Sequence, residues 1–149
     1  MAFANTDSIT ATDVNNMLRG LSINNADSAH TGDTAETDLS SFAMTGGTMG
    51  ATGRIIVEAA GTVTGAAGSK TIQLFFGASG IWTTGVLAGT NDWLVRATIS
   101  NTATNAQRIT VEASKHDGNT YNAVEYTAAA IDTTASVDIT CKVTLANSG

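Results

Sequence analysis

The feature that most constrains the fold of this chain is an alternation of apolar and polar residues with a period of two. It runs through residues 93–99, 108–113 and 137–145, where every second residue is apolar and most residues between are polar. Successive side chains of a strand point to opposite faces of a sheet, so each stretch predicts a strand with one buried face. Because burial on one face is typical of antiparallel sheets, the three stretches predict half-buried antiparallel strands.

Shorter apolar stretches predict further strands, near residues 39–44, 54–60, 71–77, 81–84 and 120–127. Glycine-rich segments separate them, and Asp117-Gly118 is typical of a tight hairpin turn. Roughly eight short strands with regular turn signals favour a sandwich or a barrel. We expect an all-β fold, an antiparallel β-sandwich over residues 39–149. Its inward-facing side chains should include Ile72, Leu74, Trp93, Val95, Ile99, Ile109, Val111, Val137, Ile139, Val143 and Leu145.

The surface of the chain must be nearly neutral. Charged residues make up 13% of the 149 residues, against roughly 25% in an average soluble domain. Hydroxyls, amides and alanine methyl groups fill the difference, and such a surface suits faces that meet other copies of the same chain. Closed symmetric assembly is the common way to cover such faces. We therefore expect self-association, as a homotrimer.

The few charges present are mostly acidic, with a net charge of −6 and a pI of about 4.5. No block of Lys and Arg provides the positive surface that nucleic acid needs, so we expect no nucleic-acid binding. No apolar run approaches the roughly 20 residues of a membrane-spanning helix. The N-terminus also lacks the charged-then-apolar pattern of a signal peptide. We expect no membrane insertion.

Residues 1–25 differ in pattern from the rest of the chain and are expected to form an anchor segment. A short helix is predicted at about residues 14–19, capped by Thr12 or Asp13 and ended by Gly20. So short a helix needs burial for stability, so it should dock on a partner. Spacings of three and four residues give it one apolar face, formed by Val14, Met17, Leu18 and Leu21.

Residues 26–38 are polar and are expected to be an extended connector between the anchor segment and the sandwich. A docked helix at the end of a connector explains the connector's length, because long structureless loops are uncommon inside compact domains. Several carboxylates lie in this stretch, but they lack the spacing of an EF-hand. The sequence leaves open whether they bind a cation.

Metal and thiol chemistry find little support in the sequence. His30 and His116 are both expected in loops, and neither has a second ligand at the spacing that a zinc site needs. Cys141 belongs to the inward face of its strand and lacks a nearby positive charge that would activate it. We expect Cys141 to be a small buried apolar residue, and we expect no metal and no cofactor.

Two enzyme motifs fail on inspection of their context. The segment 65–71 has glycines, Lys70 and Thr71, but Lys and Thr do not follow a glycine directly and a strand follows in place of a helix. Glu58, Glu112 and Glu125 lie on expected strands, where the first two alternate with apolar residues and should face solvent. The chain is expected not to be an enzyme.

The aromatic residues are the candidate contact residues. Phe75 and Phe76 are adjacent, so a strand must send them to opposite faces, and one of the pair should lie outside the core as a subunit contact. The sequence leaves open which one. Trp93 is expected in the core. Tyr121 and Tyr126 should also face opposite ways, and either could bind sugar or pack against a neighbouring subunit.

Two stretches resemble proteins of tailed-phage particles. Residues 7–17, DSITATDVNNM, are similar to the opening of many phage fibre and small virion proteins, where this segment anchors the protein to the particle. Residues 38–145 resemble the jelly-roll knobs of phage fibres and decoration proteins, which are typically trimeric. The stretches that carry this second resemblance are TMGATGRI at 48–55, KTIQLFFG at 70–77, NDW at 91–93 and TISNT at 98–102.

The resemblance implies a structural protein of a phage virion, assembled in the host cytoplasm, with other virion proteins as partners. Since the chain is short and lacks a recognisable fibre shaft, a capsid decoration protein (cement or head fibre) is the expected function. The alternative is a tail fibre or receptor-binding protein that recognises a host surface glycan. The resemblance does not distinguish the capsid from the tail.

Overall fold

The computed structural model describes residues 26, 28–32, 34–64, 69–116 and 120–146, with residues 116 and 120–123 described by their backbone only. The expected helix and its apolar residues Val14, Met17, Leu18 and Leu21 lie outside these residues, as does the expected turn at Asp117-Gly118. Within the described part of the chain the regular structure is entirely β. None of its segments is a helix long and apolar enough to cross a membrane.

Eight strands make up the described fold. Their order along the chain is β1 (Thr37–Met44), β2 (Arg54–Val63), β3 (Lys70–Phe76), β4 (Ser79–Thr83), β5 (Asn91–Ala103), β6 (Ala106–His116), β7 (Thr120–Ala129) and β8 (Val137–Leu145). Each expected strand is present, and β1 begins two residues before the expected start of the sandwich. His116 was expected in a loop, and this was wrong: it is the last residue of β6, where it pairs with Thr120.

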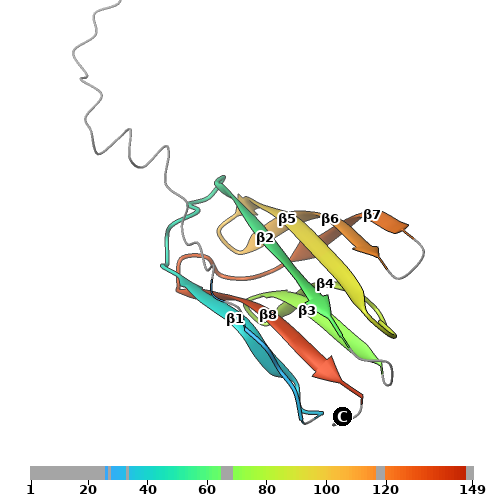
Figure 1. The fold of residues 1–149 in the computed structure, drawn as a ribbon. Helices are drawn as coiled ribbons and strands as arrows, with labels where there is room; N and C mark the ends of the chain where they lie inside the picture. Colours follow the sequence, from blue (N-terminus) through green and yellow to red (C-terminus); the bar gives the residue numbers. More distant parts are fainter. Residues whose placement is uncertain (1–25, 27, 33, 65–68, 117–119, 147–149) are drawn as a thin grey trace, which may run out of the picture.

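The strands form two four-stranded antiparallel sheets, one in the order β1-β8-β3-β4 and the other in the order β2-β5-β6-β7 (Figure 1). The chain crosses between the sheets after β1, β2, β4 and β7, while β3-β4 and β5-β6-β7 are sequence neighbours within one sheet. The first and last strands pair with each other. The expected antiparallel two-sheet architecture is confirmed.

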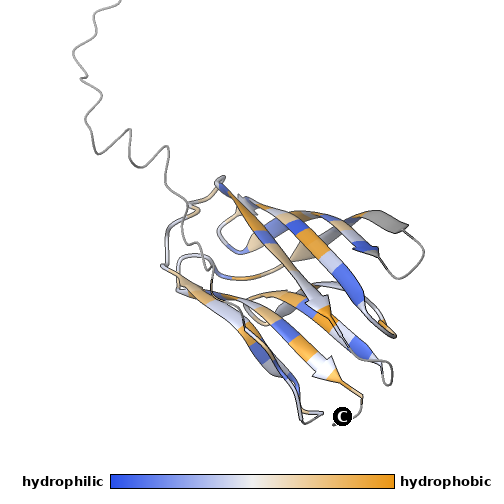
Figure 2. Cartoon of the chain, in the orientation of Figure 1, coloured by the Kyte–Doolittle hydropathy of each residue, from blue (hydrophilic) through white to orange (hydrophobic). Residues whose placement is uncertain are grey.

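The sandwich interior is filled by the residues that the period-two alternation placed inward. Val95, Ile99 and Val111 have no exposed surface, and Ile72, Leu74 and Ile109 are 1% exposed. Along β5 the residues alternate strictly between buried and exposed from Asn91 to Ala97. The same alternation appears as bands of hydrophobic and hydrophilic colour along the strands in Figure 2. The inward and outward faces that the alternation predicted for these strands are therefore confirmed.

At one end of the sandwich two tryptophans from opposite sheets meet. Trp82 of β4 and Trp93 of β5 have ring centroids 6.4 Å apart, with the ring planes tilted by 35°. Gly61 of β2 pairs with Trp93, and a Cβ atom at Gly61 would come within 2.9 Å of the indole. The large ring fits against β2 because its neighbour there has no side chain.

At the other end, a buried polar cluster joins the β5-β6 hairpin to two loops. The Asn101 amide donates to Gly50 O at 2.6 Å and to Thr133 Oγ1 at 2.7 Å, and its oxygen accepts from Gln107 Nε2 at 3.0 Å. Gln107 also bonds both backbone groups of Ile131. Buried amides are tolerated when they are hydrogen-bonded in this way, so the cluster closes this end of the core.

Candidate interaction surface

The outward face of the β2-β5-β6-β7 sheet carries most of the exposed large apolar side chains of the described chain, together with three arginines. Antiparallel pairing aligns its residues in rows that run across all four strands. The arginine row is Arg54, Ser100, Arg108 and Ala128; the tyrosine row is Ile56, Thr98, Thr110 and Tyr126; the glutamate row is Glu58, Arg96, Glu112 and Val124. We call these three rows together the arginine face.

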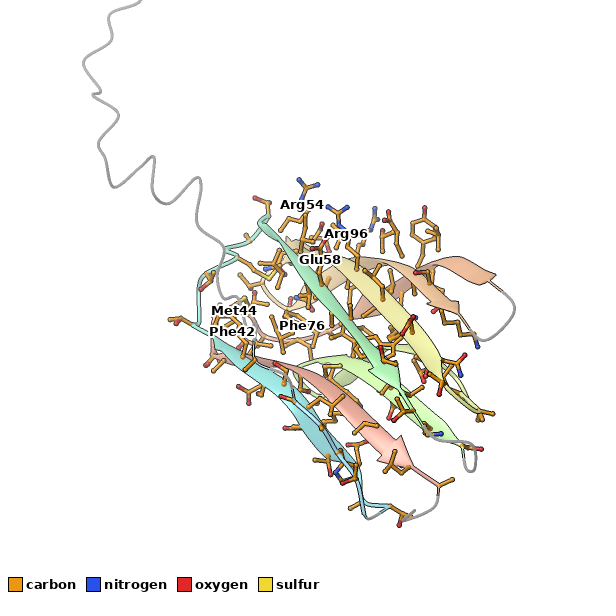
Figure 3. The ribbon with its side chains drawn as sticks, in the orientation of Figure 1. Phe42, Met44, Arg54, Glu58, Phe76 and Arg96 are labelled. Atoms are coloured by element: carbon orange, nitrogen blue, oxygen red, sulfur yellow. The ribbon has the colours of Figure 1, made fainter. Side chains whose placement is uncertain are left out.

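The charges on the arginine face are only partly paired within the chain. Arg96 Nε lies 3.1 Å from Glu58 Oε1, in an ion pair whose side chains are 47% and 65% exposed. No ion pair joins Arg54, Arg108 or Glu112 to any other residue that the structure describes. In Figure 3, Arg54, Glu58 and Arg96 point away from the sandwich, whereas Met44 and Phe76 lie between the sheets. The unpaired charges are available to a partner.

Large apolar side chains are exposed on the same side of the sheet. Of the five exposed large hydrophobic residues in the described chain, three belong to the arginine face: Ile56 at 49%, Val124 at 60% and Tyr126 at 81%. Leu94, at 49%, belongs to the next row and points the same way. Tyr and Arg are the residues most enriched in protein interfaces, and Lys is depleted there. The three rows contain three arginines, one tyrosine and no lysine, together with two glutamates, one serine and one alanine, which are depleted in interfaces. The exposed tyrosine, arginine and aliphatic side chains make this face a candidate contact surface.

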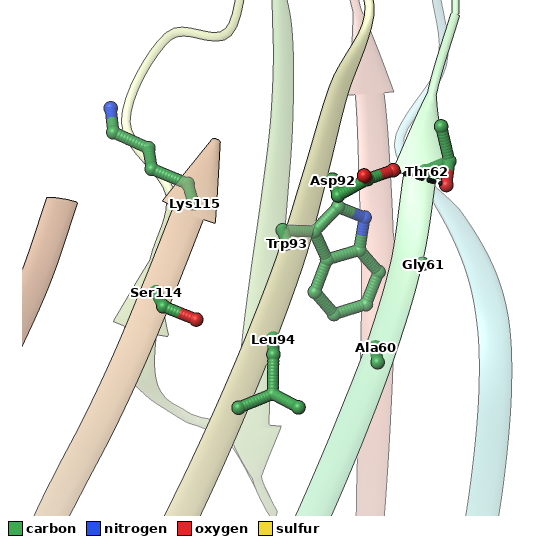
Figure 4. A pocket seen from close by; sticks show the side chains of 8 residues that line it. All are labelled: Ala60, Gly61, Thr62, Asp92, Trp93, Leu94, Ser114 and Lys115. Atoms are coloured by element: carbon green, nitrogen blue, oxygen red, sulfur yellow. Dashed lines mark hydrogen bonds between the residues drawn. The ribbon is translucent and has the colours of Figure 1, made fainter. Parts of the chain in front are cut away.

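A shallow hollow of about 490 Å³ lies beside the arginine face, at the end of the sheet where Trp93 is found. Thr62 Oγ1 donates a 2.7 Å hydrogen bond to Asp92 Oδ1 at its rim (Figure 4). By strand register, most of its lining points outward from the sheet: Ala60, Thr62, Asp92, Leu94 and Ser114. The hollow therefore offers hydroxyls and one carboxylate next to an exposed leucine.

The two phenylalanines expected at a subunit contact have different environments. Phe76 has no exposed surface and belongs to the core of its own chain, which leaves Phe75 as the candidate for a subunit contact. Phe75 lies on the outer face of its sheet, half-buried, with Lys142 Nζ 4.8 Å from the ring centroid. The alternation of Ile72, Leu74 and Phe76 carried the signal that Phe76 faces inward.

Cys141 and the carboxylates considered for chemistry are spread over the fold. Cys141 is buried on the inward face of β8, and burial raises the pKa of its thiol to about 11. Glu58 and Glu112 face outward, and each is paired in register with Arg96. Among the described residues, no three His, Cys, Asp or Glu side chains come together as a metal site. His30 lies in the segment before β1.

The rows of the arginine face could not be identified from the sequence. Alternation indicated that Glu58, Arg96, Arg108 and Glu112 face outward, but their grouping with Arg54 depends on the register between strands that are distant in sequence. Tyr126 was predicted, as an alternative to Tyr121, to bind sugar or to pack against a neighbouring subunit, and the structure places it at the end of the tyrosine row. The backbone of Tyr121 lies in β7 opposite Lys115.

No protein-family model, curated protein or solved structure matches this chain.

Proposed function

We propose that this chain is a non-enzymatic structural protein of a phage virion, a capsid decoration protein of the cement or head-fibre type. Residues 1–25 attach it to other virion proteins, and the sandwich is displayed on the particle, which is assembled in the host cytoplasm. The observation that carries the proposal is the arginine face, a sheet surface with charges unpaired among the described residues and with exposed Ile56, Val124 and Tyr126. A surface of this composition serves a protein whose work is contact with other chains.

The jelly-roll topology belongs to the same proposal. Pairing of the first strand β1 with the last strand β8, and the passage of β1, β2 and β3 from sheet to sheet, support it. The run β5-β6-β7 within one sheet is a simple meander, which makes the resemblance to a jelly roll partial. Self-association is also part of the proposal, on the basis of the low charge of the surface.

One observation favours the alternative, a tail fibre or receptor-binding protein that recognises a host surface glycan. The hollow beside the arginine face presents the hydroxyls of Thr62 and Ser114, the carboxylate of Asp92 and the side chain of Leu94. Polar groups around an apolar contact are what a sugar ring requires of a binding site. Binding of the full chain to an array of bacterial surface glycans, lost in Asp92→Ala, would support this alternative over the first function.

The test of the first function uses virions of the phage that encodes the chain. The gold-labelled full chain should decorate particles that lack it, at regular positions on the capsid. Met17→Asp/Leu18→Asp should abolish decoration while the sandwich keeps its circular dichroism spectrum, because charges cannot enter an apolar groove unpaired. Ser22→Asp, a polar position in the same segment, is the control. Normal decoration by the double variant would place attachment outside the anchor segment.

A further inference from the structure

The charges of the arginine face have opposite signs on the two sides of the tyrosine row. On β2, Arg54 and Glu58 lie two residues to either side of Ile56, and on β6, Arg108 and Glu112 lie two residues to either side of Thr110. Ile56 and Thr110 are both in the tyrosine row. Each of the two strands therefore carries a positive charge on one side of that row and a negative charge on the other.

A second copy fits this pattern if it is rotated by 180° about an axis that runs along the tyrosine row. Such a rotation keeps every strand opposite its own equivalent and reverses its direction. Arg54 then faces Glu58 of the second copy, and Arg108 faces Glu112 of the second copy. We propose that the arginine face is the contact between two copies of this chain, which pair face to face through this two-fold axis. An isologous contact of this kind uses the same patch on both subunits.

The balance of charge on this side of the sheet explains why the partner is a second copy. The outward face carries Arg54, Arg96 and Arg108, balanced by Glu58, Glu112 and Asp92, so the net charge of −6 lies on the rest of the chain. Two copies that approach through other surfaces bring together charges of the same sign. On the arginine face, opposite charges can meet. Glu58 already binds Arg96, and a carboxylate has acceptor positions for a second arginine.

The two-fold axis also covers the exposed apolar side chains. It places Tyr126 against Tyr126 of the second copy and Ile56 against Ile56, at the two ends of the tyrosine row. Tyr126 is 81% exposed in the single chain. Between these ends, half-buried Thr98 and Thr110 let the two sheets approach closely. Aligned sheets pack about 10 Å apart, which the long Arg and Glu side chains can bridge.

The area of the arginine face determines how strong a dimer we expect. Four strands about 4.8 Å apart, with three rows about 6.8 Å apart, give a footprint of roughly 400 Å² on each copy. The total of roughly 800 Å² is below the roughly 1,000 Å² of a stable specific interface, so the contact belongs to the weak, transient class. We expect a dimer that dissociates on dilution and weakens at high salt, because exposed ion pairs are screened.

The two-fold contact gives a dimer, whereas the composition and the resemblance favour a trimer. Of the proposed function, this inference rests only on self-association. It is independent of where the protein sits on a particle. If the wild-type chain decorated virions normally but did not form the dimer, this inference alone would be removed. Normal dimerisation without decoration would remove the proposed function alone.

Two charge-reversal variants of the full chain test the contact. Arg54→Glu/Arg108→Glu makes the arginine row acidic, like the glutamate row. Glu58→Arg/Glu112→Arg makes the glutamate row basic, like the arginine row. Each variant alone should sediment as a monomer of 15.1 kDa at concentrations where the wild type sediments at twice that mass. An equimolar mixture of the two should restore the dimer, because the acidic arginine row of one copy meets the basic glutamate row of the other. We expect either variant alone to dimerise at least tenfold more weakly than the mixture does.

Asp138→Arg is the matched control, a charge reversal at an exposed position of β8 on the other sheet, and it should leave the dimer intact. Tyr126→Ala provides an independent test at a highly exposed position, and it should weaken the dimer without changing the fold. A wild-type monomer at high micromolar concentration, a trimer, or a mixture that stays monomeric would each overturn the two-fold contact.

Discussion

Lys142 of β8 holds its ammonium nitrogen 4.8 Å from the centroid of the Phe75 ring in the neighbouring strand β3. The same nitrogen lies 2.8 Å from Glu36 Oε1 and 3.7 Å from Asp38 Oδ1. Glu36 immediately precedes β1, and Asp38 is the second residue of that strand. Because β8 lies between β1 and β3, one lysine connects the beginning of the sandwich to an aromatic ring two strands away.

Lys142→Met should loosen the start of β1. The hydrogen bond with Glu36, and then the charges of Glu36 and Asp38, raise the pKa of Lys142, so its ammonium group remains charged throughout the neutral range. Methionine keeps an apolar contact with Phe75 but removes both carboxylate contacts. We expect faster hydrogen exchange at the backbone amides of residues 37–40, with little change at the centre of β8.

Lys142→Arg keeps the positive charge and is the control for this variant. Exchange at residues 37–40 that is equally slow in the wild type and in Lys142→Met would show that pairing with β8 holds this end without the lysine.

Much of the sandwich could be predicted from the sequence because alternation is a local property. Val95 is apolar and the adjacent Arg96 is charged, so the inward and outward faces of β5 could be predicted from these residues directly. The two-sheet arrangement followed from the number of strands and their turns. The order of strands within each sheet could not be predicted, because pairs such as β1 with β8 join the two ends of the chain.

The candidate surface was less predictable than the core. Arg54 and Arg108 belong to one row only because β5 lies between their strands and sets both registers. Nothing local to either residue signals this. The polar cluster was also missed, since Asn101 and Gln107 look like ordinary polar strand residues until two distant loops supply their partners.

The buried thiol of Cys141 should make stability depend on pH in the alkaline range. Burial raises its pKa from 9.0 to about 11, so the folded state keeps the proton that the unfolded chain releases. This contribution to stability is fully present below pH 9.0 and is lost as the pH rises through about 11. We expect the free energy of unfolding from this group to fall by roughly 2–3 kcal/mol over this range.

Cys141→Val, which keeps an apolar side chain of similar size, should lack this part of the pH dependence in urea titrations. The wild-type thiol should also resist alkylation at pH 8 until denaturant is added. Rapid alkylation of the folded protein would contradict the buried environment.

Asn101→Ala should destabilise the sandwich through the polar cluster. It removes the donor to Gly50 O and the acceptor of Gln107 Nε2, and it leaves buried polar groups without partners. The expected loss is roughly 1–3 kcal/mol in the free energy of unfolding, measured by urea denaturation. Thr102→Ala removes an exposed hydroxyl on the next residue and should change stability by less than about 0.5 kcal/mol. Equal effects of the two substitutions would mean that the cluster contributes little.

Gly61→Val should disturb the tryptophan pair at the opposite end of the core. A Cβ atom at Gly61 would lie 2.9 Å from Cζ2 of Trp93, closer than side-chain carbons approach in folded proteins. Trp93 is only 7% exposed and contacts Trp82, so its ring has little room to move aside. Overpacking of this kind costs about 1–3 kcal/mol. We expect a lower unfolding midpoint in urea and a change in the near-ultraviolet circular dichroism of the two indoles.

Ala59→Val, which adds bulk at the half-buried β2 position opposite Val95, is the control and should leave the indole signal unchanged. An unaltered indole signal in Gly61→Val would show that Trp93 can leave its place against β2 without cost, and that the missing side chain at Gly61 does not hold the tryptophan pair in position.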